Sequence, residues 1–361
     1  MATATAELSP LGFENPMGTD GFEFVEFAAP DAQLLRSLFD KLGFPLVARH
    51  KAHDITLHRQ GDINFLINAH PQGHAADFAR DHGPSAASMA FRVKDAAAAH
   101  ARALELGATD ASEGGLGAPA IEGIGGSRLY LVDRYGPAGS FYEDSFTFED
   151  GWQAKEREAN AHLVYLDHLT HNVHRGRMAH WAEFYERLFN FREIRYFDIE
   201  GKVTGLFSKA MTSPCGKIRI PLNESQDDKS QIEEFLREYK GEGIQHIALG
   251  SDDIYASVDI LSERGIPFQD TIDTYYDLLD ERVKDHGEPL AELKKRKILV
   301  DGAPTEGQGL LLQIFTQNVI GPIFYEIIQR KGNEGFGEGN FKALFESIEL
   351  DQIRRGVISA E

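Results

Sequence analysis

A repeated order of predicted elements constrains the fold of this chain more than any other feature. A strand, a helix and then several strands occur four times along the 361 residues. Short segments support a duplication, because residues 88–91 resemble residues 246–249 and residues 141–143 resemble residues 324–326. Repeats of this kind mark one supersecondary unit that has been copied. We therefore predict an α+β fold in which duplicated βαβββ modules pair into two open-barrel domains with concave, ligand-holding faces.

The two halves of the repeat suggest a domain boundary near the middle of the chain. An acidic, helix-compatible stretch covers residues 149–161. We place an N-terminal domain at residues 1–150, without a metal site, and a C-terminal catalytic domain at residues 151–361. Near the end, three glycines between residues 335 and 339 precede an amphipathic helix predicted over residues 340–355. Such a hinged element is able to cover a pocket and exclude water.

The charge and composition of the chain exclude several classes of partner. The chain has 37 Lys and Arg against 57 Asp and Glu, so its formal net charge is −20, which repels a nucleic-acid backbone. The sequence has no apolar run of the ~20 residues that a membrane-spanning helix needs. Its single cysteine, Cys215, cannot form an intrachain disulfide and fits a reducing cytoplasm. We expect a cytoplasmic enzyme that acts on a small molecule.

Three residues of the C-terminal half form a candidate metal site. His168 and His246 stand at the start of predicted core strands, and Glu326 lies inside an apolar run. A carboxylate in such surroundings is costly to bury unless it is paired or bound to a cation. The three positions are spaced by about one module, so each side chain would come from a separate strand. Two histidines and one carboxylate are typical of non-haem Fe(II) oxygenases. Spacing alone leaves open that each histidine is an ordinary core residue.

The N-terminal half serves as an internal control for this site. At the position of His246 the repeat offers Ser88, and at the position of His168 it offers an apolar residue near Phe24. The repeat places Glu143 where the C-terminal half has Glu326. Because only the second half can complete the triad, we predict one metal ion per chain.

Several longer motifs extend from residues 14–18 to residues 354–356 and carry a specific resemblance. The chain resembles the 4-hydroxyphenylpyruvate dioxygenase family, which has the vicinal-oxygen-chelate fold. The residues that carry the resemblance are D-H-L-T-H-N-V at 167–173, P-L-N-E at 221–224, G-E-G-I-Q-H at 241–246, L-L-Q-I-F at 311–315, E-I-I-Q-R at 326–330 and G-F-G-E-G-N-F at 335–341.

The resemblance implies a set of site residues and a reaction. It implies that one Fe(II) per chain binds to His168, His246 and Glu326. It implies polar catalytic groups near the substrate at Ser208, Asn223, Gln231, Gln245 and Gln313, and a substrate pocket formed by Phe315, Phe324, Phe336, Asn340 and Phe341. The implied reaction converts the 2-oxo acid 4-hydroxyphenylpyruvate and O₂ to homogentisate and CO₂, in tyrosine and phenylalanine catabolism. Members of the family are expected to form homo-oligomers, either tetramers or dimers.

Other functions and simpler roles remain open at this point. A 4-hydroxymandelate synthase would use the same substrate and metal but hydroxylate the side chain. An extradiol catechol dioxygenase would use the same triad without releasing CO₂. A non-catalytic ligand-binding protein of the same fold would need no metal at all. The predicted polar residues could simply satisfy buried backbone groups, and the phenylalanines could be ordinary core.

Overall fold

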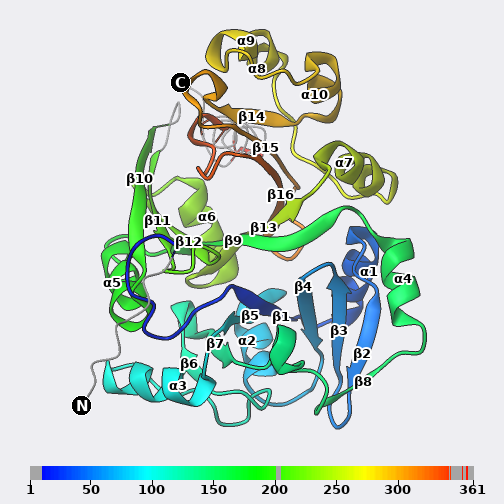
Figure 1. Cartoon of the computed structure of the whole chain (residues 1–361), viewed down its shortest axis with the longest axis vertical. Coiled ribbons are helices and arrows are strands. Elements are labelled where there is room, and N and C mark those ends of the chain that lie inside the picture. Colours follow the sequence, from blue (N-terminus) through cyan, green and yellow to red (C-terminus); the bar gives the residue numbers. More distant parts are fainter. Residues whose placement is uncertain (1–9, 201–204, 341, 343–351, 353–354, 357–361) are drawn as a thin grey trace.

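The computed structural model describes residues 10–200, 205–340, 342, 352 and 355–356. Two eight-stranded sheets, one from each half of the chain, lie one above the other along the long axis of the molecule (Figure 1). Each sheet consists of two modules in which one strand is followed by one helix, or by four helices in the last module, and then by three strands. The predicted α+β fold of duplicated βαβββ modules is therefore confirmed.

The N-terminal half contains the first sheet and its covering helices. Its elements are β1 (Phe22–Ala28), α1 (Ala32–Leu42), β2 (Leu46–His50), β3 (Ile55–Gln60), β4 (Ile63–Asn68), α2 (His74–His82), β5 (Ser85–Arg92), α3 (Ala96–Glu105), β6 (Ala120–Glu122), η1 (Ile124–Gly126), β7 (Arg128–Val132), η2 (Gly136–Ala138) and β8 (Phe146–Phe148). Helix α4 (Trp152–Ala159) then leads to the second sheet.

The C-terminal half repeats this order with a longer insertion before its last three strands. Its elements are β9 (Leu163–Val173), α5 (Met178–Phe189), β10 (Arg192–Glu200), β11 (Gly205–Thr212), β12 (Arg219–Ser225), α6 (Gln231–Tyr239), β13 (Gly243–Ser251), α7 (Ile254–Glu263), α8 (Asp273–Asp277), α9 (Leu279–Arg282), α10 (Leu290–Arg296), β14 (Leu299–Gly302), η3 (Pro304–Glu306), β15 (Leu310–Phe315) and β16 (Phe324–Lys331).

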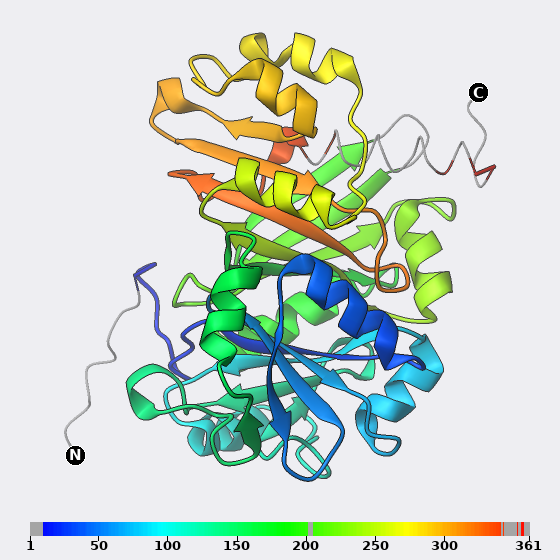
Figure 2. The ribbon, with the colours of Figure 1, turned by 90° about the vertical axis from the view of Figure 1, so that its right-hand side faces the viewer.

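Local sequence signals explain why helix α1 begins and ends where it does. The Asp31 carboxylate accepts a hydrogen bond from the backbone N–H of Gln33, which caps the first turn. The helix ends at Gly43, whose φ of 85° is left-handed and whose missing Cβ would lie 2.6 Å from the Ala159 carbonyl oxygen. Helices α1, α4 and α7 lie on the same side of the molecule (Figure 2). The core is formed where the apolar faces of the helices pack on the two sheets.

Seven neighbouring strands have the same order in both sheets, which confirms the duplication: β6-β7-β5-β1-β4-β3-β2 corresponds to β15-β16-β13-β9-β12-β11-β10, whereas β8 and β14 lie at opposite edges. The first sheet runs β6-β7-β5-β1-β4-β3-β2-β8, and the second runs β14-β15-β16-β13-β9-β12-β11-β10. Both also contain a one-residue register shift at the same place, shown by the pairs Glu26–Ser88 and Phe27–Ala86 in the first sheet and Thr170–His246 and His171–Ile244 in the second. The extra residue is Ala87 in β5 and Gln245 in β13. Two strands that share such an irregularity are equivalent.

This register corrects one alignment of the sequence repeat. The central alanines of β5 and β13 each pair with one residue on either side: Ala90 with Phe24 and Tyr130, and Ala248 with His168 and Glu326. The N-terminal half therefore has Phe24, Ser88 and Tyr130 at the positions of the three predicted ligands. The prediction that Glu143 matches Glu326 is wrong, because Glu143 lies in an exposed turn between η2 and β8. The alignment was wrong because residues 141–143 and 324–326 have the same three amino acids at positions that are not equivalent in the fold.

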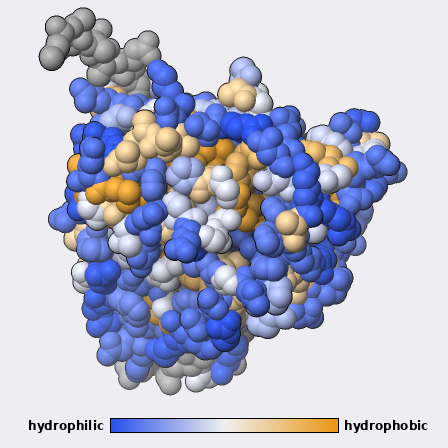
Figure 3. Space-filling view, turned by 90° about the horizontal axis from the view of Figure 1, so that it is seen from below, coloured by the Kyte–Doolittle hydropathy of each residue, from blue (hydrophilic) through white to orange (hydrophobic). Residues whose placement is uncertain are grey.

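The face of the molecule drawn in Figure 3 is mostly polar. Seen from below, the molecule is mostly hydrophilic, with small and scattered apolar patches (Figure 3). Within the described residues, none of the helices has the length and apolar character needed to cross a membrane.

A buried histidine of the N-terminal half gives a prediction about acid stability. His58 is 3% exposed, and its Nδ1 and Nε2 atoms lie 3.1 Å from the Phe44 carbonyl and the Thr56 hydroxyl. Burial lowers the pKa of His58 from 6.5 to about 4, so the unfolded chain binds this proton first as the pH falls. Between about pH 7 and pH 5, His58 should therefore remove about 2 kcal/mol from the free energy of unfolding.

Urea unfolding of the His58→Gln variant at both pH values would test this prediction. The variant should lose less stability on acidification than the wild-type chain, by about 2 kcal/mol. His180→Gln, which changes an exposed histidine, should leave the acid-induced loss unchanged. An identical loss in the His58→Gln and wild-type proteins would contradict the assignment.

Candidate metal centre

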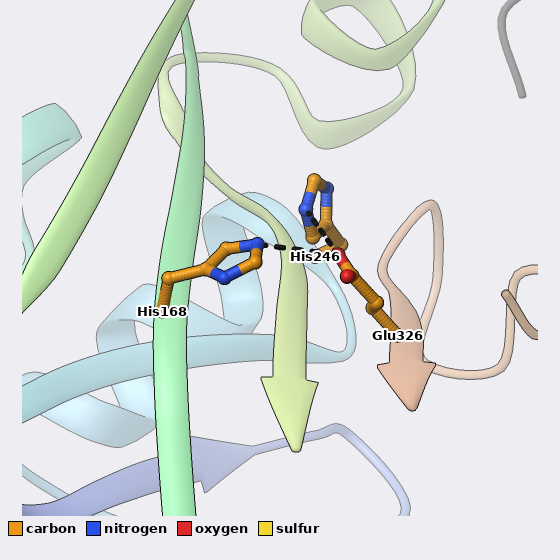
Figure 4. A group of neighbouring side chains, drawn as sticks. All are labelled: His168, His246 and Glu326. Carbon is orange, nitrogen blue, oxygen red and sulfur yellow. Dashed lines mark ion pairs between the residues drawn. The ribbon is translucent and has the colours of Figure 1, made fainter. Parts of the chain in front are cut away.

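His168, His246 and Glu326 converge from three neighbouring strands. They lie on β9, β13 and β16, and their side chains point toward one another (Figure 4). The Glu326 Oε2 atom lies 3.2 Å from His168 Nε2 and 3.5 Å from His246 Nε2, and each residue is 1% exposed. One ligand atom from each residue lies within 4.8 Å of the others. Among the described residues, this is the one group of three or more His, Cys, Asp or Glu residues with such geometry.

The donor atoms of this group fit a metal ion. The Nε2 atoms of His168 and His246 are buried and make no hydrogen bond to any described residue. A buried nitrogen without a hydrogen-bond partner costs free energy of folding, whereas a bound metal ion would accept the lone pair of each Nε2 atom. The Nδ1 atoms are held instead by side chains, at 2.8 Å from Asp167 Oδ1 and 3.0 Å from Gln245 Oε1. Metal-binding histidines usually have such a partner on the second nitrogen.

The electrostatics of the site keep the carboxylate ionised. Burial raises the pKa of Glu326, but the electrostatic effect of the neighbouring His168 and His246 side chains outweighs burial and lowers the pKa to about 2. Burial lowers the pKa of His246, so its imidazole is neutral. The site thus presents an anionic oxygen beside imidazole nitrogens, which is a suitable donor set for a divalent transition metal.

A buried ion pair between Asp167 and Arg330 holds the Nδ1 side of the His168 ring in place. Asp167 is fully buried, and its two carboxylate oxygens accept hydrogen bonds from Arg330 Nε and Nη2 at 2.6 and 2.8 Å. Burial alone would raise the pKa of Asp167, but Arg330 and His168 hold it well below its usual value. Arg330 Nη1 also donates to the Gly335 carbonyl at 2.6 Å, in the loop that precedes Phe336. Arg330 therefore links Asp167, which holds the candidate ligand His168, to the loop that precedes Phe336.

The register shift in β13 explains the position of Gln245. Because Gln245 is the extra residue, its side chain does not follow the regular alternation and reaches the Nδ1 atom of the next residue, His246. Asn223 Nδ2 also approaches Gln245 Oε1, at 3.4 Å. Gln245 therefore contacts the candidate ligand His246 directly, and Asn223 contacts Gln245.

Gln313 orients the third ligand rather than standing free in the pocket. Its Nε2 atom donates to Glu326 Oε1 at 2.7 Å, which leaves Oε2 directed at the two histidines. Its Oε1 atom accepts a hydrogen bond from Asn340 Nδ2 at 2.8 Å. The loop can approach this closely because Gly337 has a φ of 75° and no Cβ, which would lie 2.0 Å from Gln313 Oε1. Gln313 and Asn340 therefore fix the geometry of Glu326.

Aromatic rings enclose the three ligands. The Phe324 ring stacks on His246 with centroids 5.0 Å apart and an interplanar angle of 22°. Phe315 approaches His246 edge-on at 6.5 Å, and Phe336 approaches His168 at 5.7 Å. All three phenylalanines are buried, so they keep bulk water away from the ligand atoms.

Next to the ligands, four buried polar side chains have unused hydrogen-bonding atoms. Ser208 on β11 pairs in register with Asn223 on β12, and Thr170 and Asn172 share the face of β9 that carries His168. The unused atoms are Ser208 Oγ, Asn223 Oδ1, Thr170 Oγ1 and Asn172 Nδ2, none of which bonds to a described residue. Such atoms are available to the polar groups of a bound molecule.

Two predicted site residues are placed differently from the others. Gln231 is the first residue of α6, so it is the one member of the predicted polar set that does not lie on a strand. Phe341 lies outside the described residues, as does most of the helix predicted over residues 340–355.

Sequence reasoning missed four residues that the structure brings to the site. Asp167 and Arg330 lie in the quoted motifs, next to His168 and four residues after Glu326. Thr170 and Asn172 are two and four residues after His168, so the strand period of two was a signal that could have found them.

Comparisons with known proteins agree with this geometry. The family described as "Hydroxyphenylpyruvate dioxygenase, HPPD, N-terminal" matches residues 13–147, and the "Glyoxalase/Bleomycin resistance protein/Dioxygenase superfamily" matches residues 165–293. A 4-hydroxyphenylpyruvate dioxygenase from Pseudomonas aeruginosa is 62% identical over 351 residues, which cover 95% of this chain and 97% of the relative. A protein named Hemolysin VllY from Vibrio vulnificus is 61% identical over 96% of this chain and 98% of its own length.

A solved structure also resembles the whole chain. It is a mutant of 4-hydroxymandelate synthase from Streptomyces coelicolor, with a TM-score of 0.78 and 29% identity, covering 92% of this chain and 99% of that chain. The sequence relative that carries the dioxygenase name is about twice as similar by identity. The chain therefore belongs to the 4-hydroxyphenylpyruvate dioxygenase family of enzymes.

Proposed function

We propose that this enzyme uses one Fe(II) per chain to convert 4-hydroxyphenylpyruvate and O₂ to homogentisate and CO₂. The observation that carries the proposal is the buried group of His168, His246 and Glu326 in a member of this family. In the balanced reaction, one oxygen atom of O₂ enters the new carboxylate and the other enters the ring, while the side chain moves to a neighbouring ring carbon. Two neutral imidazoles and one carboxylate would leave Fe(II) with a net charge near +1, which suits an anionic 2-oxo acid.

The residues of the chain would bind and orient the substrate. When bound, the metal supplies Lewis acidity and one-electron chemistry that side chains lack. The phenylalanines around the ligands exclude water and offer apolar walls to an aromatic ring. The unused polar atoms of Ser208, Asn223 and Asn172 can bond the polar groups of the substrate. Gln313 and Gln245 hold two of the metal ligands in place.

The proposal extends to the setting of the reaction. We place the enzyme in tyrosine and phenylalanine catabolism, in the cytoplasm, as a homo-oligomer that is a dimer or a tetramer. The name of the 62% identical relative supports the pathway, and the single cysteine, which cannot form an intrachain disulfide, fits a reducing cytoplasm. Size-exclusion chromatography with light scattering would determine the oligomeric state.

Identification of the product would test the proposed reaction. The chain would be loaded anaerobically with Fe(II) and then supplied with 4-hydroxyphenylpyruvate and O₂, and CO₂ and the aromatic product would be measured together. We expect homogentisate and CO₂ in equal amounts, matching the O₂ consumed. Formation of 4-hydroxymandelate would instead identify a synthase, and O₂ consumption with no aromatic product would contradict both.

Asn223→Ala should weaken substrate binding without releasing the metal. The substitution removes the unused Oδ1 atom, and the loss of one buried hydrogen bond is worth about tenfold in KM. Fe(II) content should stay the same, because Asn223 approaches a ligand only through Gln245. Steady-state kinetics and metal analysis would be compared with Gln153→Ala, which changes an exposed residue of α4. An unchanged KM would remove Asn223 from the substrate pocket.

A further inference from the structure

The concave face of the N-terminal sheet holds a second cavity. Its volume is about 330 Å³, and its lining includes Asn68, Arg128 and Tyr130. The shared register places these residues where the C-terminal half has Asn223, Phe324 and Glu326, respectively. The cavity is thus the counterpart of the metal centre in the other copy of the fold, with different chemistry.

A buried carboxylate in this cavity has neutral partners. Glu26 is 2% exposed and lines the cavity. Its two oxygens accept hydrogen bonds from the Ser88 hydroxyl at 2.5 Å and from Asn68 Nδ2 at 2.7 Å. A buried carboxylate is costly unless a cation compensates its charge. Glu26 therefore offers an anionic site to a positively charged group.

The same cavity contains a guanidinium group whose partners are also neutral. Arg128 Nη2 donates to the Glu113 carbonyl at 2.8 Å, and Nη1 donates to the Tyr130 hydroxyl at 3.4 Å. Burial is the main reason that the pKa of Tyr130 is raised to about 12, so its hydroxyl stays neutral. Since a guanidinium forms strong paired hydrogen bonds with a carboxylate, Arg128 offers a site for an anionic group.

The N-terminus of helix α2 adds to the site that Arg128 offers to an anionic group. Gly73 and the first two residues of α2 line the cavity, and Gly73 provides no side-chain cap. The first backbone N–H groups of a helix favour a carboxylate. His74 Nε2 lies 2.9 Å from the Gly126 carbonyl oxygen, and its Nδ1 atom is buried without a partner among the described residues.

We propose that this cavity binds a free α-amino acid as a zwitterion. Its carboxylate would bind to Arg128 and the start of α2, and its ammonium group to Glu26. Ile55 and Leu116 give the cavity apolar walls for the side chain of the ligand. The rim includes the exposed His53, so a ligand can enter from the solvent. The site binds without catalysis, since Phe24, Ser88 and Tyr130 stand where the other half has metal ligands.

Isothermal titration calorimetry on the Fe(II)-loaded, full-length chain would test the ligand class. The probes are L-alanine, L-leucine, L-glutamine and L-phenylalanine. For L-leucine, two matched analogues remove one charge each: 4-methylpentanoate lacks the ammonium group, and 3-methylbutylamine lacks the carboxylate. We expect at least one of the amino acids to bind. Each of its two analogues, which lack one charge apiece, should bind at least about tenfold more weakly. Where the bound amino acid is not leucine, its own deaminated and decarboxylated analogues replace this pair.

Two outcomes of this titration would overturn the proposal. One is that none of the four amino acids binds at about 10 mM. The other is that the deaminated analogue binds as tightly as the amino acid, which would make the cavity a simple anion site.

Variants locate the binding in the N-terminal cavity. Arg128→Gln and Glu26→Gln should each weaken amino-acid binding about tenfold or more. Arg102→Gln, on the exposed side of α3, should have no effect. His246→Ala should bind the amino acid like the wild type, which separates this site from the metal centre. Because Glu26→Gln changes a buried group, Arg128→Gln decides the result, and unchanged binding in that variant would overturn the proposal.

Discussion

Glu326→Ala is expected to abolish turnover and metal retention while the chain stays folded. The substitution removes the one anionic ligand and leaves two imidazoles. Changes to residues that only support a ligand lower metal affinity about 10- to 100-fold, so the loss of the ligand itself should exceed about 100-fold. The fold should persist because the apolar core is spread over both sheets and all four modules.

Metal analysis after anaerobic loading, homogentisate formation and thermal unfolding would measure these three properties. Glu143→Ala is the matched control, since the sequence repeat aligned this exposed glutamate with Glu326 but the structure places it in a turn. That control should bind metal and turn over normally. Measurable turnover in Glu326→Ala would contradict the ligand assignment.

Asp167→Asn should have the second largest effect, on both metal affinity and stability. The carboxylate orients His168 through Nδ1, and the loss of such support lowers metal affinity about 10- to 100-fold. The substitution also leaves Arg330, whose side chain is 7% exposed, without its charged partner. Breaking a buried ion pair on one side costs about 3–5 kcal/mol of the free energy of unfolding.

Competition with a chelator would measure Fe(II) affinity, and urea unfolding would measure stability. Asp252→Asn is a matched control, because Asp252 pairs with His162 at 2.9 Å on the surface, where both side chains are exposed. Lower stability with unchanged Fe(II) affinity would show that Asp167 only supports the fold. Wild-type values for both quantities would reject the positioning role and the ion pair together.

The sequence predicted the elements of the fold better than their pairing. Alternating and helical patterns identified the modules, and the position of Ser88 in the repeat agrees with the register of β5. The alignment of Glu143 with Glu326 failed because both residues end the same three-residue sequence, Phe-Tyr-Glu. The residue equivalent to Glu326 in the fold is Tyr130, whose side chain has different chemistry, so nothing in the sequence signals the match. The shift at Gln245 has no local signal, since pairing between strands β9 and β13 determines it.

The grouping of His168, His246 and Glu326 was predictable because each of the three stands out within its own strand. Its supporting residues were less visible, because their role depends on partners far away in the sequence. Asp167 and Arg330 are 163 residues apart, and each alone is an ordinary charged residue in a strand. Gln313 belongs to the predicted polar set, but only the structure reveals that its amide donates a hydrogen bond to Glu326.

The matching irregularity at Ala87 and Gln245 bears on the history of the chain. An extra residue at equivalent points of both sheets is most simply inherited from a common ancestor of half the present length. In one descendant half, that kink now carries a glutamine that holds a histidine in place. In the other half it carries only the methyl group of Ala87, so the two halves share the distortion of the backbone but not the contact made there.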